Sequence, residues 1–316
     1  MPSASASEYQ IHGQTRFPWT DLAALQNLRL NTSVPKPDKT QIPPGHVLVR
    51  IRAAALNARD MMVIAHDPIY PGPHVPDLEV ATKGAGGEQG TLREYGVLPD
   101  NELILAPPHL TFEELAAMPA CGATAMHALF CGPKKLKPGQ TVLAMGTGGV
   151  SCFVIQLAHA IGATVIATSS TDAKLGKAIE MGAAYTVNYT TSPSWSTEVL
   201  RLTHGLGVDL VVDIGGATTL QESVKAVKRG GQVSLVGFLG GSTKADLADL
   251  VADVIFGGKT LYGVFNFTAE MTERAVRMVG EKEIRPVVEV FEWEQAREAF
   301  EMLSKQVAVG KIVVKV

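Results

Sequence analysis

The sequence predicts an α/β protein whose main sheet is parallel and doubly wound, and two observations support this prediction. From residue 141 onward, short apolar runs typical of strands alternate with segments that repeat apolar residues at helical spacing. This alternation predicts a crossover helix between successive parallel strands, with helices covering the sheet. The second observation is a glycine-rich turn, GTGG at residues 146–149, directly after the first of these strands.

Residues 141–170 predict one strand–turn–helix–strand unit. TVLAM (141–145) and TVIAT (164–168) are the strands, and Gly162 ends the helix between them. Apolar residues on one face of that helix recur at intervals of four, three and four: Val150, Val154, Leu157 and Ile161. A right-handed crossover of this kind, opened by glycines, is the unit that binds dinucleotides.

The glycine turn has a physical reason to bind phosphate. Gly146 permits a tight turn, and Gly148 lets the backbone approach a pyrophosphate closely. The free N–H groups at the helix start then face the anion, with the positive end of the helix dipole behind them. Ser151 replaces the third glycine of the fingerprint and is small enough to pack against the sheet. The alternative is an ordinary turn between strand and helix with no ligand.

Before residue 141, the segments predicted as strands and helices alternate less regularly. We expect residues 1–8 to be disordered, 16–30 to form a strand or short helix, and the proline-rich 35–45 to form a loop. Strands are predicted at 46–55, 91–98 and 102–106, and helices at 57–64 and from the capping box at Thr111. The segment 116–130 is alanine-rich and is expected to be buried.

The segments after residue 170 continue the alternation. Helices are predicted at 174–181, 196–203, 220–227 and 247–256, and strands at 185–189, 208–214, 232–238 and 260–264. A final helix at 291–303 and strand at 311–316 come after the alternation ends, and we expect them to return to the first domain.

Composition excludes several classes of partner. The chain has 316 residues, 46% of them hydrophobic and 19% charged, and a net charge of −3, so nothing favours nucleic acid or an anionic membrane. No apolar run reaches membrane-spanning length, and the N-terminus lacks the features of a signal peptide. Three cysteines without metal spacing fit a reduced compartment. We therefore expect a cytoplasmic protein.

With these pieces in place, the chain resembles the medium-chain dehydrogenase/reductase superfamily, most closely its zinc-independent quinone oxidoreductase and alcohol dehydrogenase-like branch. The resemblance lies in segments at 47–60, 90–100, 110–129, 136–151, 162–175, 181–189, 207–216 and 230–241. It implies a GroES-like, mainly β catalytic domain (1–120 and 290–316) and a Rossmann NADP(H)-binding domain (121–289). It also implies NADPH-dependent transfer of hydride to an activated C=C, quinone or carbonyl compound in a cleft between the domains.

The resemblance also assigns cofactor contacts. The residues implied to hold the pyrophosphate are Gly146, Thr147, Gly148, Gly149 and Val150. Those implied near the adenosine ribose are Ser169, Ser170, Lys174 and Tyr189, and those near the nicotinamide are Phe238, Asn57 and Thr124.

The end of the second strand favours NADPH over NADH. An NAD site usually has an acidic residue there to bind the ribose hydroxyls. This chain has Ser169 and Ser170, with Lys174 one turn later, and two hydroxyls with an ammonium suit a 2′-phosphate better. Asp172 favours NADH, but it also suits the cap of the next helix.

No metal is expected. The zinc-dependent relatives place a cysteine near residues 57–59 and a Gly-His-Glu further on, and this chain has neither. Cys121 lies near the third ligand position without partners, and His66 and His74 lack matched spacing.

The chain departs from the family between residues 75 and 90, where a strand pair of the GroES-like domain is expected to be missing. Loss of this pair would open one wall of the cleft, and hydride transfer needs a closed one. A cofactor-binding scaffold without turnover and a non-redox biosynthetic enzyme are therefore the alternatives. Asp60 and Tyr95 are polar and near the expected cleft, but no catalytic acid is assigned. Relatives suggest a homodimer joined through the edge of the Rossmann sheet.

Overall fold

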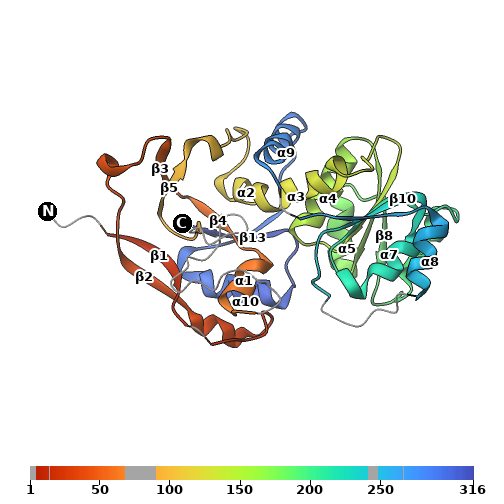
Figure 1. Cartoon of the computed structure of the whole chain (residues 1–316), viewed down its shortest axis with the longest axis horizontal. Coiled ribbons are helices and arrows are strands. Elements are labelled where there is room, and N and C mark those ends of the chain that lie inside the picture. Colours follow the sequence, from red (N-terminus) through yellow and green to blue (C-terminus); the bar gives the residue numbers. More distant parts are fainter. Residues whose placement is uncertain (1–4, 14, 68–89, 241–247, 266) are drawn as a thin grey trace. The chain divides into compact units, whose positions relative to one another are not determined.

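The computed structural model describes residues 5–13, 15–67, 90–240, 248–265 and 267–316 (Figure 1). Contacts within the chain divide it into two compact units, Met1–Ala117 with Val288–Val316 (unit 1) and Met118–Val287 (unit 2). The expected loss of a strand pair between residues 75 and 90 falls almost wholly outside the described residues, as does His74.

Unit 2 is built on a six-stranded sheet in the order β11-β10-β9-β6-β7-β8, with every neighbouring pair parallel. The strands are β6 (Thr141–Met145), β7 (Thr164–Ser169), β8 (Tyr185–Asn188), β9 (Val208–Asp213), β10 (Val227–Leu235) and β11 (Thr260–Gly263). Two three-stranded halves run outward from β6 and β9, which is the dinucleotide-binding order. The predicted doubly wound parallel sheet is confirmed.

Helices cover this sheet in two packed groups. One group joins α4, α9 and the helical segment from residue 118 to 131, and the other joins α6, α7 and α8 (Figure 1). The helices are α3 (Ala123–Met126, between π-helical turns Met118–Gly122 and His127–Cys131), α4 (Gly149–Ala160), α5 (Asp172–Glu180), α6 (Trp195–Leu202), α7 (Leu220–Ala226), α8 (Ala248–Gly257) and α9 (Ala269–Glu281). A 3₁₀ turn, Gly216–Thr218, precedes α7.

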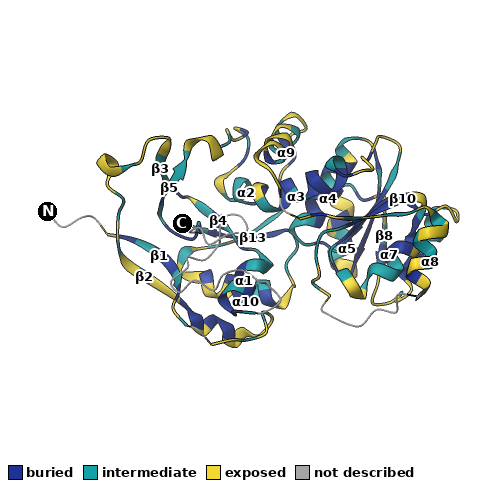
Figure 2. Cartoon of the chain, in the orientation of Figure 1, coloured by how far each residue is buried: buried dark blue, intermediate teal, exposed yellow. Residues whose placement is uncertain are grey.

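The core of the sheet explains the continuous apolar runs in the sequence. Leu143 of β6, Ile166 of β7 and Val211 of β9 are buried on the sheet, and Trp195 and Val199 of α6 pack against them. Because helices cover both faces of a parallel sheet, its strands are apolar throughout rather than alternating. Figure 2 shows this burial as a dark blue interior in unit 2.

Unit 1 consists of three small sheets with short helices. β1 (Ser5–Ile11) pairs antiparallel with β2 (Leu28–Pro35), and β3 (His46–Arg50) with β5 (Tyr95–Pro99). The third sheet has the order β12-β13-β4, formed by Val288–Phe291, Lys311–Lys315 and Ala53–Ala55. The α-helices are α1 (Ala58–Ile64), α2 (Phe112–Ala116) and α10 (Ala296–Lys305), and the 3₁₀ turns are Leu22–Asn27, Lys39–Gln41, Asp100–Glu102 and Trp293–Gln295.

The core of unit 1 joins its two chain segments. Leu25, Leu56 and Met61 from the first segment pack in one buried cluster with Phe300 of α10 and Val314 of β13. The C-terminal strand therefore completes a core that begins near the N-terminus.

Several sequence expectations are wrong in unit 1. The expected strand at 102–106 is absent, because Leu105 is 94% exposed and no strand among the described residues pairs with this segment. Residues 5–8, expected to be disordered, belong to β1, because pairing with β2 supplies hydrogen bonds that local propensity does not predict. The single strand at 46–55 is two strands that enter different sheets. The helix expected at 291–303 begins only at Ala296, after β12.

Among the described residues, no helix is long and apolar enough to cross a membrane.

Candidate functional site

The candidate site lies at the carboxyl edge of the unit 2 sheet. Its order reverses between β6 and β9, whose following loops lead to α4 on one side and to a glycine pair, Gly215 and Gly216, on the other. Open α/β sheets bind ligands at this switch point, beyond the carboxyl ends of the strands. The loops after β6, β7, β9 and β10 are therefore the first place to look for a site.

The glycine turn after β6 is held in a conformation that few other residues adopt. Gly146 has a φ of +75°, in the left-handed region, and its N–H donates to Thr168 Oγ1 over 3.3 Å. The Ser151 hydroxyl is buried and donates to the Met145 carbonyl over 2.6 Å, which fixes the start of α4 against the end of β6. The small residue at position 151 therefore allows close contact between helix and strand.

The N-terminus of α4 presents backbone donors with no side chain in front of them. Gly148 is the N-cap and makes no side-chain cap hydrogen bond, and the first bond of the helix runs from the Cys152 N–H to the Gly148 carbonyl. The N–H groups of residues 149–151 precede that bond, so the helix itself gives them no acceptor. Their direction and the helix dipole both favour an anion here.

The space in front of this turn fits a phosphate group. A Cβ atom added at Gly148 would meet no protein atom within 4 Å, so the backbone here is open to a ligand. Thr147 is buried, and its hydroxyl lies 3.2 Å from that of Ser169 at the end of β7. The turn and the end of β7 are thus tied together. The five residues predicted to hold the pyrophosphate, 146–150, all lie in this turn and the start of α4.

The residues assigned to the adenosine ribose gather where β7 and β8 end. The N–H of Tyr189 donates to the Ser169 carbonyl over 3.1 Å, and the Thr190 hydroxyl donates to the Ser170 carbonyl over 3.0 Å. Lys174 lies in the first turn of α5, where its own N–H is capped by the Thr171 hydroxyl. The structure therefore places these four assigned residues on adjoining segments.

Asp172 does not have the role expected of it. The N-cap of α5 is Thr171, not Asp172, because the Thr171 hydroxyl accepts from the Lys174 N–H. The Asp172 carboxylate instead accepts a hydrogen bond from the Asn188 amide over 2.8 Å. This bond ties α5 to the end of β8.

Asp213, at the end of β9, organises the far side of the site and was not singled out from the sequence. Its buried carboxylate accepts from the N–H groups of Gly215 and Gly216 and from the Thr219 and Ser223 hydroxyls, over 2.6 to 2.9 Å. An acidic residue at the end of an apolar strand, followed by two glycines, is the signal that could have found it. These bonds hold the loop that follows β9.

The loop after β9 in turn supports the loop that carries Phe238. Gly216 has a φ of +76°, and a Cβ there would lie 2.9 Å from the Gly237 carbonyl oxygen. The N–H of Leu239 donates to the Ile214 carbonyl over 3.2 Å. Phe238 is 45% exposed, so its ring is available to a ligand at this edge of the sheet.

The two remaining assigned residues lie in different units. Thr124 is on α3 of unit 2, and its hydroxyl donates to the Ala120 carbonyl. Asn57 is the N-cap of α1 in unit 1, where its N–H donates to the Asp60 carboxylate over 2.7 Å. Asp60 is buried in this capping role, and the ring of Tyr95 lies 4.1 Å from the Lys36 ammonium. Neither contact identifies a catalytic acid.

Lys311 is a residue that the sequence analysis missed. Its side chain is buried and donates to the Asn57 Oδ1 over 2.6 Å and to the Leu56 carbonyl. A buried ammonium needs such acceptors, because desolvation of an unpaired charge is costly. Lys311 therefore fixes the orientation of the Asn57 amide from 254 positions further along the chain.

The described residues contain no group of three or more histidine, cysteine, aspartate or glutamate side chains that could hold a metal ion. Cys121 is buried at the start of the 118–131 helical segment, and the His66 Nε2 lies 2.7 Å from the Gly13 carbonyl oxygen.

Comparison with known proteins identifies the family. A family model described as zinc-binding dehydrogenase matches residues 149–281. A zinc-type alcohol dehydrogenase-like protein of Schizosaccharomyces pombe is 33% identical, over 89% of this chain and 95% of the relative. Quinone oxidoreductase-like protein 2 of Bos taurus is 29% identical, over 73% and 68%. The crystal structure of an NAD-dependent alcohol dehydrogenase matches with a TM-score of 0.83 and 29% identity, covering 98% of this chain and 99% of that one.

The chain therefore belongs to the medium-chain dehydrogenase/reductase superfamily. Its relatives are oxidoreductases, and the dehydrogenase fold implies a nicotinamide dinucleotide as cofactor.

Replacing Gly148 with valine should abolish dinucleotide binding without unfolding the protein. The new side chain would fill the open space before α4, yet its Cβ meets no protein atom within 4 Å. We expect binding to weaken by at least about a hundredfold in calorimetric titration with NADPH. The matched control is Gly176→Val on α5, where a Cβ also meets nothing within 4 Å. Equal affinities of the two variants would refute the assignment of the turn.

Proposed function

We propose that the protein is a zinc-independent, NADPH-dependent reductase that acts on an activated C=C, quinone or carbonyl compound. The single observation that carries the proposal is the open N-terminus of α4 at Gly148, framed by the ends of β7 and β9. The quinone oxidoreductase-like relative supports the class of acceptor. When bound, the reduced nicotinamide would supply the hydride.

The residues of the chain then have distinct tasks. The α4 N-terminus binds the pyrophosphate, and the loops tied together by Asp213 support Phe238 beside the expected nicotinamide position. In unit 1, Lys311 holds the Asn57 amide in one orientation by donating to its oxygen. Pre-organised polar groups of this kind lower the cost of aligning donor and acceptor.

The preference for NADPH rests on charge at the end of β7. Ser170 and Lys174 lie beside the expected ribose position, and the Asp172 carboxylate is already bonded to Asn188. An ammonium and hydroxyls favour a 2′-phosphate, whereas a ribose diol favours a free carboxylate. The solved NAD-dependent relative shows that the same fold also serves NAD, so the preference needs a direct test.

Replacing Lys174 with glutamate should weaken NADPH binding by at least about tenfold and NADH binding by no more than roughly twofold. The physical reason is that only NADPH carries the phosphate which the ammonium would attract. The matched control is Lys177→Glu on the same helix, where the lysine pairs with Glu180 over 2.9 Å. Fluorescence titration with both coenzymes measures the effect. An equal loss for NADPH and NADH would show the preference to be wrong.

The reductase proposal is tested directly by mixing purified protein with NADPH and a panel of quinones, enones and aldehydes. We expect consumption of NADPH, followed by its absorbance, with at least one acceptor class, because the phosphate turn and its supporting loops are complete. Binding without consumption across the panel would instead identify a cofactor-binding scaffold. Conversion of a substrate without consumption of NADPH would identify a non-redox enzyme.

We also propose a cytoplasmic homodimer that joins through the free edge of β11. Exposed apolar side chains lie on β11, on α8 before it and in the segment that follows: Val251, Ile255, Phe256, Leu261 and Phe265. Exposed apolar surface of this kind is typical of an interface. Sedimentation should show a dimer at micromolar concentration and a monomer for Phe256→Glu; a wild-type monomer would refute the proposal.

A further inference from the structure

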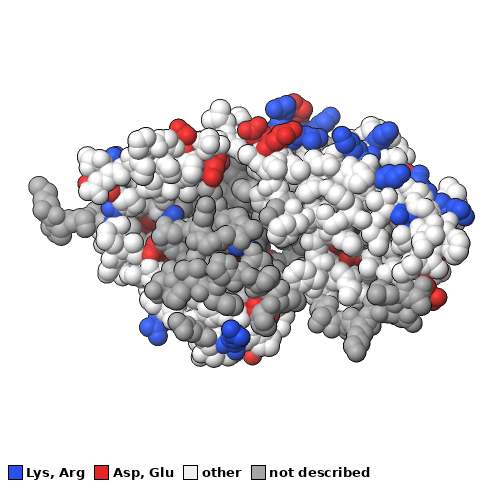
Figure 3. Space-filling view, viewed as in Figure 1, with Lys and Arg blue, Asp and Glu red and all other residues white. Residues whose placement is uncertain are grey.

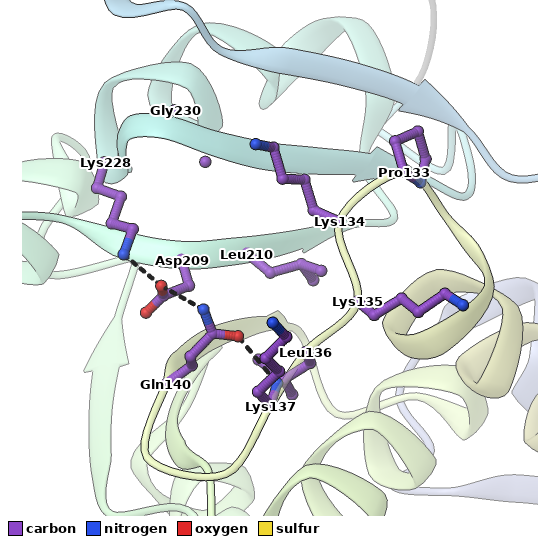
Figure 4. A pocket seen from close by; sticks show the side chains of 11 residues that line it. Pro133, Lys134, Lys135, Leu136, Lys137, Gln140, Asp209, Leu210, Lys228 and Gly230 are labelled. Atoms are coloured by element: carbon purple, nitrogen blue, oxygen red, sulfur yellow. Dashed lines mark hydrogen bonds and ion pairs between the residues drawn. The ribbon is translucent and has the colours of Figure 1, made fainter.

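A pocket lies at the edge of the unit 2 sheet opposite to the glycine turn. It has a volume of about 430 Å³ and is lined by the loop before β6, the start of β9 and the turn within β10 (Figure 4). The lining residues near the strands are Gln140, Asp209, Leu210, Gly230 and Gly231. Because the six strands are parallel, this amino edge is remote from the carboxyl edge where the dinucleotide is expected.

The pocket is strongly cationic in a chain whose net charge is negative. Its lining contains four lysines (Lys134, Lys135, Lys137 and Lys228) and one aspartate, Asp209, which gives a net charge of +3 against −3 for the whole chain. In Figure 3, Lys and Arg side chains gather with few acidic ones over the end of unit 2 that carries β10. A hollow lined by one sign of charge concentrates ions of the other sign.

Asp209 does not neutralise all the positive charges of the lysines that line the pocket. The Asp209 carboxylate accepts from the Gln140 amide and the Thr141 N–H, both over 2.9 Å, and pairs with the Lys228 ammonium. Within the described part of the chain, Lys134, Lys135 and Lys137 form no ion pair. Three positive charges on one short loop are therefore not paired with any carboxylate of the described residues.

The loop that carries these lysines is fixed to the sheet. The Lys134 N–H donates to the side chain of the fully buried Gln232, and the Lys137 N–H donates to that of Gln140, both over 2.9 Å. Between them, Leu136 is buried and its N–H donates to the Leu129 carbonyl. The lysine backbone is thus held in place before any ligand arrives, which lowers the entropic cost of binding.

The pocket leaves room for a ligand at its centre. Figure 4 shows the Lys134 side chain extending from the loop toward Gly230, whereas Lys135 extends away from the Lys228–Asp209 pair. Gly230 has a φ of +70°, and a Cβ there would meet nothing within 4 Å. A ligand can therefore contact the ammonium groups and the turn of β10 together.

From this arrangement we propose that the pocket binds a small phosphorylated metabolite carrying at least two negative charges. Lysine ammonium groups bind phosphate oxygens through strong charge-assisted hydrogen bonds. The volume lies within the usual range for small-molecule sites, about 300–1,000 Å³. Nucleic acid is disfavoured because the remainder of the chain is acidic overall. Occupancy of this site would stabilise unit 2 without contacting the dinucleotide.

The test uses the full chain saturated with NADPH, so that the glycine turn is occupied. It is repeated without NADPH in Gly148→Val, in which that turn is blocked. Calorimetric titrations with inorganic pyrophosphate, glucose 6-phosphate and citrate compare two phosphate compounds with a multivalent carboxylate. Pyrophosphate and glucose 6-phosphate should bind the wild type. The double variant Lys134→Gln, Lys137→Gln should bind them at least about tenfold more weakly.

The matched control is Lys177→Gln, Lys225→Gln, which removes two lysines that pair with glutamates elsewhere on unit 2. It should bind both phosphates within roughly twofold of the wild type. The melting temperature of the Lys134, Lys137 variant should not fall, because the variant removes like charges and no hydrogen bond. Three outcomes would overturn the proposal: no binding of any phosphate up to about 10 mM, equal weakening in both double variants, or citrate binding more tightly than the phosphates.

Discussion

One physical constraint underlies the candidate site: the first turn of α4 has backbone N–H donors to which neither the helix itself nor the N-cap residue, Gly148, offers an acceptor. The geometry at Gly146 turns the chain sharply, Gly148 leaves the approach open, and Ser151 holds the helix against β6. A helix start of this kind favours an anion. The bonds between Thr147 and Ser169, and those around Asp213, hold the neighbouring loops in positions that suit the rest of a dinucleotide.

The parallel sheet gives its two edges different chemistry. The carboxyl edge collects glycine-rich loops, hydroxyls and exposed aromatic rings, among them Tyr189 and Phe238. The amino edge collects lysines around the single carboxylate of Asp209. Both follow from the same topology, since parallel strands bring all their starts to one edge and all their ends to the other. The edge where the cofactor is expected and the edge where we propose an anion pocket therefore do not overlap.

Local sequence patterns predicted a helix or strand correctly where the residues that form the pattern also form the element. Apolar periodicity predicted β6 at its observed bounds and α4 to within a residue, and the capping box at Thr111 is formed as expected. Contacts between distant residues were not predictable in this way. The Lys311–Asn57 bond spans 254 positions, and β1 exists only because β2 pairs with it. The strand expected at 102–106 does not form for the same reason, since no strand in the described part of the chain pairs with it.

The most direct measurement of the central claim is hydrogen exchange at the backbone amides of residues 149–151, with and without saturating NADPH. Exchange in this turn should slow markedly on binding, because the amides would then donate to phosphate oxygens. Unchanged exchange there, in protein shown by calorimetry to have bound NADPH, would contradict the claim and place the phosphate elsewhere.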